Sequence, residues 1–170
     1  MNSVHPDASS ADTLPSGLAG EPTWTPLVQF NEMFGTRSFL DEDTDRLLLR
    51  YYHDPARGDG HTFVRVWFGP GAEGPPGHAH GGAMAAVLDE AMGTAALLRG
   101  KPSVAAEITC RFLAMLPLGV VATAEAEAAP PDAEGRMAVT VRLVGPDGTL
   151  HAEGTGTFAV LGDRGLARLG

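Results

Sequence analysis

The stretch that decides the fold is "GPPGHAHGGAMAAVLDEAMGTAALL", residues 74–98. Its opening Pro/Gly passage leads into a run that is rich in Ala, Leu and Met and contains no proline, which favours a helix from residue 81 to residue 98. Arg99 and Gly100 suit the end of such a helix, as a cation in the last turn and a C-terminal glycine. Because the run is apolar on nearly every side, it predicts a buried central helix.

Two adjacent carboxylates, Asp89 and Glu90, interrupt this apolar run. Burying an unpaired charge is costly, so such a charge is either compensated or used. On a helical wheel Asp89 falls among small residues, which permit close approach of a second subunit or a ligand. Those small residues are Gly82, Ala85, Gly93 and Ala96. Glu90 points about a quarter turn away, so we do not expect both carboxylates to serve one site.

The segments that flank this helix alternate between apolar and polar residues, the pattern of half-solvated antiparallel strands. Upstream, residues 46–53 and 61–68 are separated by a turn-rich passage and predict a hairpin. Downstream, four further strands are predicted at residues 104–112, 120–128, 136–144 and 150–160, with short connections between the last three. In the first of the four, Val104, Ala106, Ile108, Cys110 and Phe112 share the apolar face. The pattern predicts a curved antiparallel sheet wrapped around the helix.

A shorter helix is predicted at residues 25–35, since apolar residues there recur at helical spacing. Those residues are Leu27, Phe30, Met33 and Phe34.

The length of 170 residues suits one domain. We expect a disordered tail over residues 1–22, the folded domain over 23–162 and a flexible tail over 163–170. The apolar run around Asp89 is too short and too charged to span a membrane, and the first 22 residues lack the features of a secretory signal. The net charge of −9 argues against non-specific nucleic-acid binding. A single cysteine, Cys110, makes an internal disulfide impossible and makes the cytoplasm the expected compartment; we expect Cys110 to be inert.

The helix and its entry resemble the PaaI-like acyl-CoA thioesterases of the hotdog-fold superfamily. Their signature is His-Gly-Gly followed, nine residues after the His, by an Asp, which corresponds here to His80, Gly81, Gly82 and Asp89. The likeness covers residues 51–160 and includes the strand "AAEITCRFLAMLP" at 105–117. The resemblance implies an α+β hotdog fold and hydrolysis of an acyl thioester to a free acid and a thiol, without a metal or other cofactor.

The resemblance also implies a role for each residue of the motif. The Gly81 N–H forms the oxyanion hole, His80 orients the thioester or the turn, and Asp89 activates water or attacks directly. Physical chemistry agrees, because N–H groups at a helix N-terminus stabilise a developing oxyanion and a carboxylate in an apolar setting can act as base or nucleophile. Asp89 lies about 13 Å along the helix axis from His80. The family solves this by pairing the two groups across a subunit interface, so a homodimer or tetramer is expected.

Two positions depart from the pattern of many relatives. Gly74 stands where many carry Asn or Gln, and Ala105 stands where some place Thr or Ser near the catalytic carboxylate. Loss of these polar groups leaves open a second function, a non-catalytic protein that binds or senses acyl thioesters.

Structural alternatives remain for the motif residues. Asp89 could be a buried carboxylate paired with Arg111, Gly81 and Gly82 could serve only a tight turn, and Glu90 could be structural. A metal site built from His78 and His80, with His53 or His61 completing it, lacks a definite third ligand, and we predict none.

The expected substrate contacts come from the turn, the helix and the basic residues, because coenzyme A is polyanionic and needs a local cation. The candidates for substrate binding are Gly82, His78, Glu90, Arg111 and Arg136. Further basic candidates are Arg57, Arg99 and Lys101.

Overall fold

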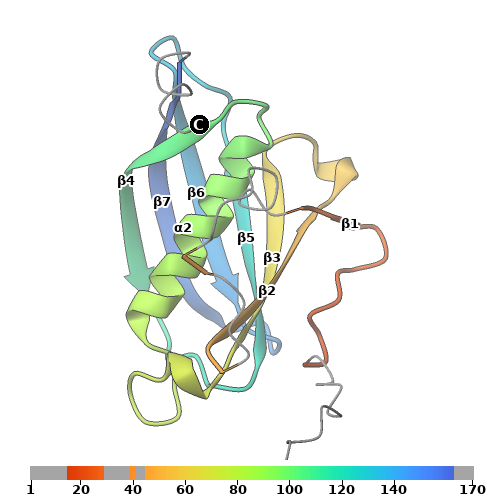
Figure 1. Cartoon of the computed structure of the whole chain (residues 1–170), viewed down its shortest axis with the longest axis vertical. Coiled ribbons are helices and arrows are strands. Elements are labelled where there is room, and N and C mark those ends of the chain that lie inside the picture. Colours follow the sequence, from red (N-terminus) through yellow and green to blue (C-terminus); the bar gives the residue numbers. More distant parts are fainter. Residues whose placement is uncertain (1–14, 29–38, 41–44, 163–170) are drawn as a thin grey trace, which may run out of the picture.

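A computed structural model describes residues 15–28, 39–40 and 45–162. In these ranges seven strands form one antiparallel sheet whose concave face holds a long helix, α2 (Figure 1). The elements are β1 (Thr25–Pro26), β2 (Leu47–His53), β3 (His61–Phe68), α2 (Gly81–Leu97), β4 (Ser103–Phe112), β5 (Val121–Ala128), β6 (Arg136–Val144) and β7 (Leu150–Val160). The predicted fold class, a curved sheet wrapped around a central helix, is confirmed.

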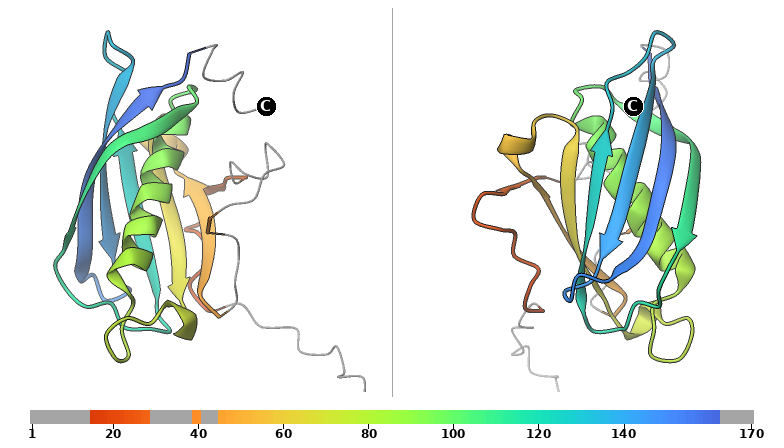
Figure 2. Two further views of the ribbon diagram at one scale, coloured as in Figure 1. Left: turned by 60° about the vertical axis from the view of Figure 1, so that its left-hand side comes forward. Right: turned by 180° about the vertical axis from the view of Figure 1, so that it is seen from behind.

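Helix α2 begins where the sequence predicts and ends within one residue of the prediction. His80 has an extended backbone and caps its N-terminus, and the chain leaves the helix toward Gly100, which has a positive φ of 75°. The side of α2 that faces the sheet is fully apolar, and its buried residues are Met84, Val87, Leu88, Ala91, Met92, Ala95 and Ala96. Figure 2 shows the sheet curving around this side of the helix. Burial of this surface, rather than helix propensity alone, stabilises α2.

The sheet supplies the other half of the core, and its alternation is most regular in β6. In β6 buried and exposed residues alternate from Arg136 to Leu143, and the buried ones contact α2 residues in one continuous cluster. Phe68 at the end of β3 is the largest fully buried side chain of that cluster. The hairpin of β2 and β3 forms as predicted, and so does the run of β5, β6 and β7.

Strand β4 takes a place in the sheet that the sequence does not reveal. The strand order is β1-β2-β3-β5-β6-β7-β4, so β4 pairs only with β7 and forms one edge of the sheet (Figure 1). Among the described residues nothing pairs with its outer edge. Most of its residues are exposed although the strand is ten residues long. Such an edge is a ready template for another strand.

A β-bulge changes which residues of β4 face the helix. Ala105 pairs with Phe158 and Glu107 pairs with Thr157, so Ala106 is an extra residue between consecutive pairs. Directly opposed residues in an antiparallel pair share a face. Because Phe158 is buried against α2, Ala105 also faces the helix.

The predicted inner face of β4 is therefore wrong in its first half. Val104 pairs with Ala159 and lies on the opposite face from Ala105, while Ala106 is the bulged residue. From Ile108 onward the alternation follows the prediction. The extra residue in the bulge shifts the period of two by one position.

The predicted helix at residues 25–35 is wrong where the structure describes it. Thr25 and Pro26 form β1 and pair with His53 and Tyr52 of β2. Backbone pairing continues beyond β1, since the Leu27 N–H donates to the Tyr51 carbonyl at 2.9 Å. The rest of that prediction, with Phe30, Met33 and Phe34, lies outside the described residues.

Residues 15–22, part of the predicted tail, pack on the convex face of the sheet. Leu18 is 3% exposed and packs with Leu48 and Val121, and the Tyr52 hydroxyl donates to the Leu18 carbonyl at 2.9 Å. Residues 1–14 and 163–170, in the two predicted tails, lie outside the described residues. Across the described part of the chain, no helix is long and apolar enough to cross a membrane.

Candidate functional site

The N-terminus of α2 presents one uncommitted backbone donor. The His80 carbonyl accepts from the Ala83 and Met84 N–H groups at 3.0 and 3.1 Å, and the His80 Nδ1 accepts from the Gly82 N–H at 2.9 Å. Among the described residues the Gly81 N–H has no acceptor. It lies at the positive end of the helix dipole, so it is available to an anionic or carbonyl oxygen.

A tight loop holds His80 in this capping position. The His80 N–H donates to the Ala72 carbonyl at 2.8 Å, and the Gly74 N–H donates to the His78 carbonyl at 2.9 Å. The Glu73 carboxylate accepts from the Gly77 N–H at 2.7 Å and closes the Pro/Gly passage. The sequence forms this turn because its prolines and glycines favour turn geometry.

Gly74 fits where no other residue can. A Cβ added to Gly74 would lie 2.7 Å from the His80 Cα, a contact with backbone that cannot move away cheaply. The position that carries Asn or Gln in many resembling proteins is thus closed here by the path of the backbone at His80.

Asp89 lies near the middle of α2 and lines a pocket of about 230 Å³. The pocket lies between α2, the start of β4 and β7, and its lining is Asp89, Glu90, Gly93, Thr94, Leu97, Ser103, Val104, Ala105 and Phe158. Burial raises the pKa of Asp89 above its ordinary value. No hydrogen bond or ion pair to Asp89 occurs within the described part of the chain. The alternative of an Asp89–Arg111 pair is not observed, since Arg111 binds Glu153 at 2.6 Å.

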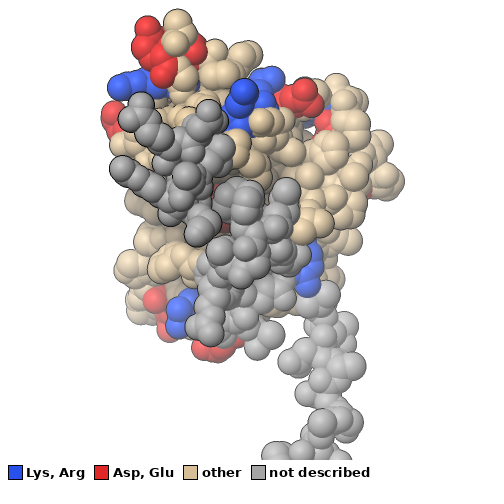
Figure 3. Space-filling model, turned by 45° about the horizontal axis from the view of Figure 1, so that its top comes forward, with Lys and Arg blue, Asp and Glu red and all other residues tan. Residues whose placement is uncertain are grey.

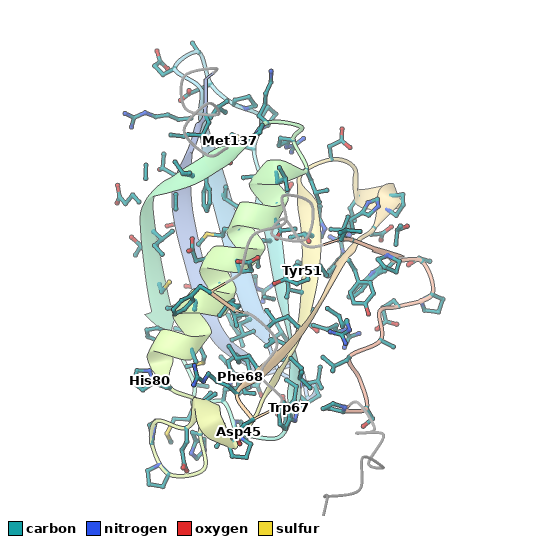
Figure 4. All side chains as sticks on the ribbon, viewed as in Figure 1. Asp45, Tyr51, Trp67, Phe68, His80 and Met137 are labelled. Atoms are coloured by element: carbon teal, nitrogen blue, oxygen red, sulfur yellow. The ribbon has the colours of Figure 1, made fainter. Side chains whose placement is uncertain are left out.

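Glu90 lines the same pocket as Asp89, contrary to the expectation that the two carboxylates serve different places. The Tyr51 hydroxyl of β2 donates to the Glu90 Oε1 at 3.3 Å. Burial is the main cause that raises the pKa of Glu90; the Tyr51 hydrogen bond lowers it and the nearby Asp89 charge raises it. Figure 4 shows Tyr51 beside the middle of the helix and His80 near its lower end.

Ala105 reaches this pocket because of the β4 bulge. Ala105, where some resembling proteins carry Thr or Ser, therefore lines the same pocket as Asp89. Cys110, further along the same face, is partly buried, and burial together with Asp89 raises its pKa.

The remaining predicted contacts lie away from Asp89. His78 is half-buried and its Nδ1 lies 2.8 Å from the Pro76 carbonyl oxygen, within the loop. Gly82 is exposed in the first turn of α2. Arg111 and Arg136 belong to strands β4 and β6 and are exposed, Arg111 beside Glu153.

Other polar groups considered from the sequence are engaged elsewhere or dispersed. Arg99 donates to the Ala128 carbonyl at 2.7 Å, and Arg57 lies 3.4 Å from Glu125. On the face in Figure 3, the coloured basic side chains occur in small separate groups rather than in one broad area. No cluster of three or more His, Cys, Asp or Glu residues suited to a metal ion is found among the described residues.

Two features of the site are not evident from the sequence. Tyr51, the partner of Glu90, lies on the buried face of β2, where strand alternation alone predicts only a core residue. Phe112, half exposed at the end of β4, lies over Gly81, because a Cβ there would be 3.7 Å from its ring. Both contacts join elements distant in sequence, so no local pattern encodes them.

Comparisons with known proteins agree with this geometry. Residues 76–129 match the family model described as thioesterase superfamily, a range that includes His80, α2, β4 and β5. Acyl-coenzyme A thioesterase THEM5 of Mus musculus is 28% identical over 141 residues, which cover 75% of this chain. The match covers 56% of THEM5, so the chain spans little more than half the length of this curated relative.

Solved structures share the fold. The phenylacetic acid degradation protein PaaI of Thermus thermophilus aligns with a TM-score of 0.57 at 26% identity, covering 69% of this chain and 96% of that one. A Streptococcus mutans UA159 protein solved with acetyl-CoA aligns with a TM-score of 0.58 at 22% identity, covering 61% and 83% of the two chains. With the His-Gly-Gly turn, the central helix and the wrapping sheet, these likenesses show a hotdog-fold protein that is similar to the thioesterase superfamily and to PaaI.

Proposed function

We propose that the protein hydrolyses acyl-CoA, or a related acyl thioester, to a free carboxylic acid and a thiol. The observation that carries this proposal is that, among the described residues, the Gly81 N–H at a helix N-terminus has no acceptor and Asp89 lines a pocket without a hydrogen-bond or ion-pair partner. The name of the mouse relative, acyl-coenzyme A thioesterase, and the acetyl-CoA in the streptococcal structure support the substrate class.

In the proposed reaction the Gly81 N–H binds the thioester carbonyl oxygen and stabilises its negative charge in the tetrahedral intermediate. A glycine at this position leaves room for the acyl group beside the backbone. The His80 Nδ1 accepts a hydrogen bond from the Gly82 N–H, an arrangement in which the ring hydrogen is on Nε2. That exposed Nε2–H is a second donor next to Gly81, suited to orient the thioester.

Asp89 supplies the other half of the chemistry in one of two ways. As a general base it takes a proton from water while the water oxygen bonds to the carbonyl carbon, and the C–S bond then breaks to release the thiolate. As a nucleophile it attacks the carbonyl carbon itself, the C–S bond breaks to release the thiolate, and water then hydrolyses the mixed anhydride to the free acid and the regenerated Asp89 carboxylate. Both routes require the ionised carboxylate.

We propose that the two halves meet across a dimer. Within one chain they lie about 13 Å apart along α2, too far to act on one carbonyl. The exposed edge of β4 can pair with the same edge of a second copy, and large apolar side chains are exposed along it and just beyond it. These are Val104, Ile108, Phe112, Leu113 and Met115. A dimer or a tetramer of such dimers then places Asp89 of one subunit opposite the Gly81 turn of its neighbour.

The other proposed contacts serve binding. Gly82, His78 and Glu90 would line the path of the acyl thioester, and Arg111 and Arg136 would meet the phosphates of coenzyme A where it emerges at the surface. Arg111 is already paired with Glu153, so in this role its guanidinium would contact a phosphate and Glu153 together. We place this activity in the cytoplasm.

A second candidate function is binding or sensing of acyl thioesters without turnover. The observation that favours it is Ala105, which puts a methyl group in the Asp89 pocket where a hydroxyl would help to hold water. Gly74 also favours this second function, because it lacks the side-chain amide of Asn or Gln. Any side chain at this position would force His80 to move.

The deciding experiment measures thiol release from short, long and aromatic acyl-CoAs by wild type, Asp89→Asn and Gly81→Pro. Proline is well tolerated at the first helical position, and His80 already has the extended backbone that precedes a proline. Gly81→Pro therefore removes the donor without breaking α2, and Gly81→Ala, which keeps the N–H, is its matched control. We expect losses of roughly 10²- to 10⁴-fold in both test variants. Tight binding without hydrolysis by wild type would establish the sensing function instead.

A further inference from the structure

The Asp89 pocket has a polar side that hydrolysis does not use. Besides Asp89, three groups with polar side chains line it: Glu90, Thr94 and Ser103. The Thr94 hydroxyl donates to the Glu90 backbone carbonyl at 2.9 Å and so leaves the carboxyl group alone. The other lining residues are apolar or glycine. A purely hydrocarbon acyl group would leave this polar side without partners, which is costly.

Glu90 has unused hydrogen-bonding capacity in this pocket. Its Oε1 accepts one hydrogen bond, from the Tyr51 hydroxyl, while no described residue donates to its Oε2. No ion pair joins Glu90 to a cation within the described part of the chain. Burial and the neighbouring Asp89 raise the pKa of Glu90, while the Tyr51 hydrogen bond lowers it. An ionised carboxylate accepts a hydrogen bond from a hydroxyl group, and a protonated carboxyl group can also donate one to an oxo group.

The pocket offers a small space beside Asp89 for part of an acyl group. Its volume is about 230 Å³, and it is open to the surface on one side. Phe158, which is 2% exposed, closes the side toward the sheet. A short acyl group fits within this space, whereas a long chain would extend out through its open side.

We propose that Glu90, held by Tyr51, determines specificity by hydrogen bonding a hydroxyl or oxo group on a short acyl chain, so that the preferred substrates are short acyl thioesters bearing such a group. This inference rests on the proposed hydrolase function and adds the acyl class to it. Asp89 performs the chemistry and Glu90 selects the acyl group.

The test compares two acyl-CoAs that differ by one hydroxyl group, butanoyl-CoA and 3-hydroxybutanoyl-CoA in both enantiomers. The measured quantity is the ratio of their kcat/KM values in wild type, Glu90→Met, Glu90→Gln and Tyr51→Phe. A hydrogen bond to a buried group supports a preference of about 10- to 100-fold for one hydroxy enantiomer in wild type. Glu90→Met should bring the ratio close to one, Tyr51→Phe should lower it, and Glu90→Gln, which still donates and accepts, should retain most of it.

Glu127→Met is the matched control, because Glu127 is an exposed residue of β5 far from the pocket lining. Its ratio should equal that of wild type. Thermal unfolding of each variant verifies that it is folded. If Glu90→Met does not fold, the kcat/KM ratios of Glu90→Gln and Tyr51→Phe still test the inference.

Three results would overturn the inference while leaving hydrolysis intact: a wild-type ratio near one, a preference that survives in Glu90→Met, or equal loss of both substrates in that variant. Absence of hydrolysis of every acyl-CoA by wild type would instead overturn the proposed function. The same pair is then compared by calorimetric binding, where a Glu90-dependent difference in Kd upholds the selectivity and equal Kd values refute it.

Discussion

At the residue scale, the site combines groups that cost stability with groups that chemistry needs. Asp89 is an unpaired carboxylate in a pocket, and the Gly81 N–H is a helix donor without an acceptor among the described residues. Natural sequences retain such features where function requires them, at the expense of stability. We therefore expect a substitution that removes either group to raise the stability of the protein and to lower its activity.

Asp89→Asn should lower kcat/KM by about 10²- to 10⁴-fold and raise Tm at pH 8. Because the folded-state pKa of Asp89 is raised, the folded protein favours its neutral form. That stabilising contribution is complete below the ordinary pKa of about 3.9 and is lost as pH rises through the folded value. The Tm difference between variant and wild type should thus be larger at pH 8 than at pH 4. A larger difference at pH 4 would contradict this assignment.

The proposed role of Asp89 also predicts the pH dependence of the wild-type reaction. Since the ionised carboxylate is required, kcat/KM should rise with pH and level off above the raised pKa of Asp89. The midpoint should lie above the ordinary Asp value of about 3.9 in a pH–rate profile. A midpoint at or below that value would show that another group limits the rate.

Gly74→Ala tests the loop that holds His80. The added Cβ would lie 2.7 Å from the His80 Cα, so the backbone must shift. We expect a loss of about 1–3 kcal/mol in the free energy of unfolding, measured by urea denaturation, together with reduced turnover. Gly162→Ala, where a Cβ meets nothing within 4 Å, is the control. Equal stability of the two variants would mean that the loop adapts freely.

At the element scale, regular alternation was predictable and the pairing of β4 was not. The bounds of β3, β6 and β7 coincide with the prediction, and in β6 buried and exposed residues alternate with a period of two. The edge position of β4 and its bulge at Ala106 depend on contacts with β7, about fifty residues later in the chain, which no local pattern reports. For the same reason the sequence predicts the His80 turn but does not reveal the Tyr51–Glu90 contact.

The exposed edge of β4 is where an inward-pointing charge should separate subunits. Ile108 lies on the inner face of β4 and is 40% exposed, so a lysine there can reach water in a monomer but would be trapped in a paired edge. Ile108→Lys should sediment as a monomer and lose thiol release. Thr109→Lys, on the other face of the same strand, should still form the oligomer. An Ile108→Lys variant that remains dimeric would place the interface elsewhere.

At the scale of the whole molecule, the fold places the His80 turn and Asp89 on one helix but does not bring them together. The His80 turn and Asp89 occupy the N-terminal end and the middle of α2, and the sheet packs against the helix along this length. In the proposed mechanism a single subunit therefore carries two separate half-sites. If they combine across a two-fold axis, each dimer contains two complete sites, each drawing one half from each chain.

Mixing two inactive variants distinguishes this arrangement from a site within one chain. Asp89→Asn and Gly81→Pro are unfolded together in equal amounts, refolded, and assayed for thiol release. In a heterodimer one site receives both substitutions and the other receives neither, so random pairing should restore about a quarter of wild-type activity. A site built within one chain would give no recovery, because every chain carries a defect. Each variant refolded alone provides the baseline, and Ile108→Lys combined with either substitution should abolish the recovery by preventing the dimer.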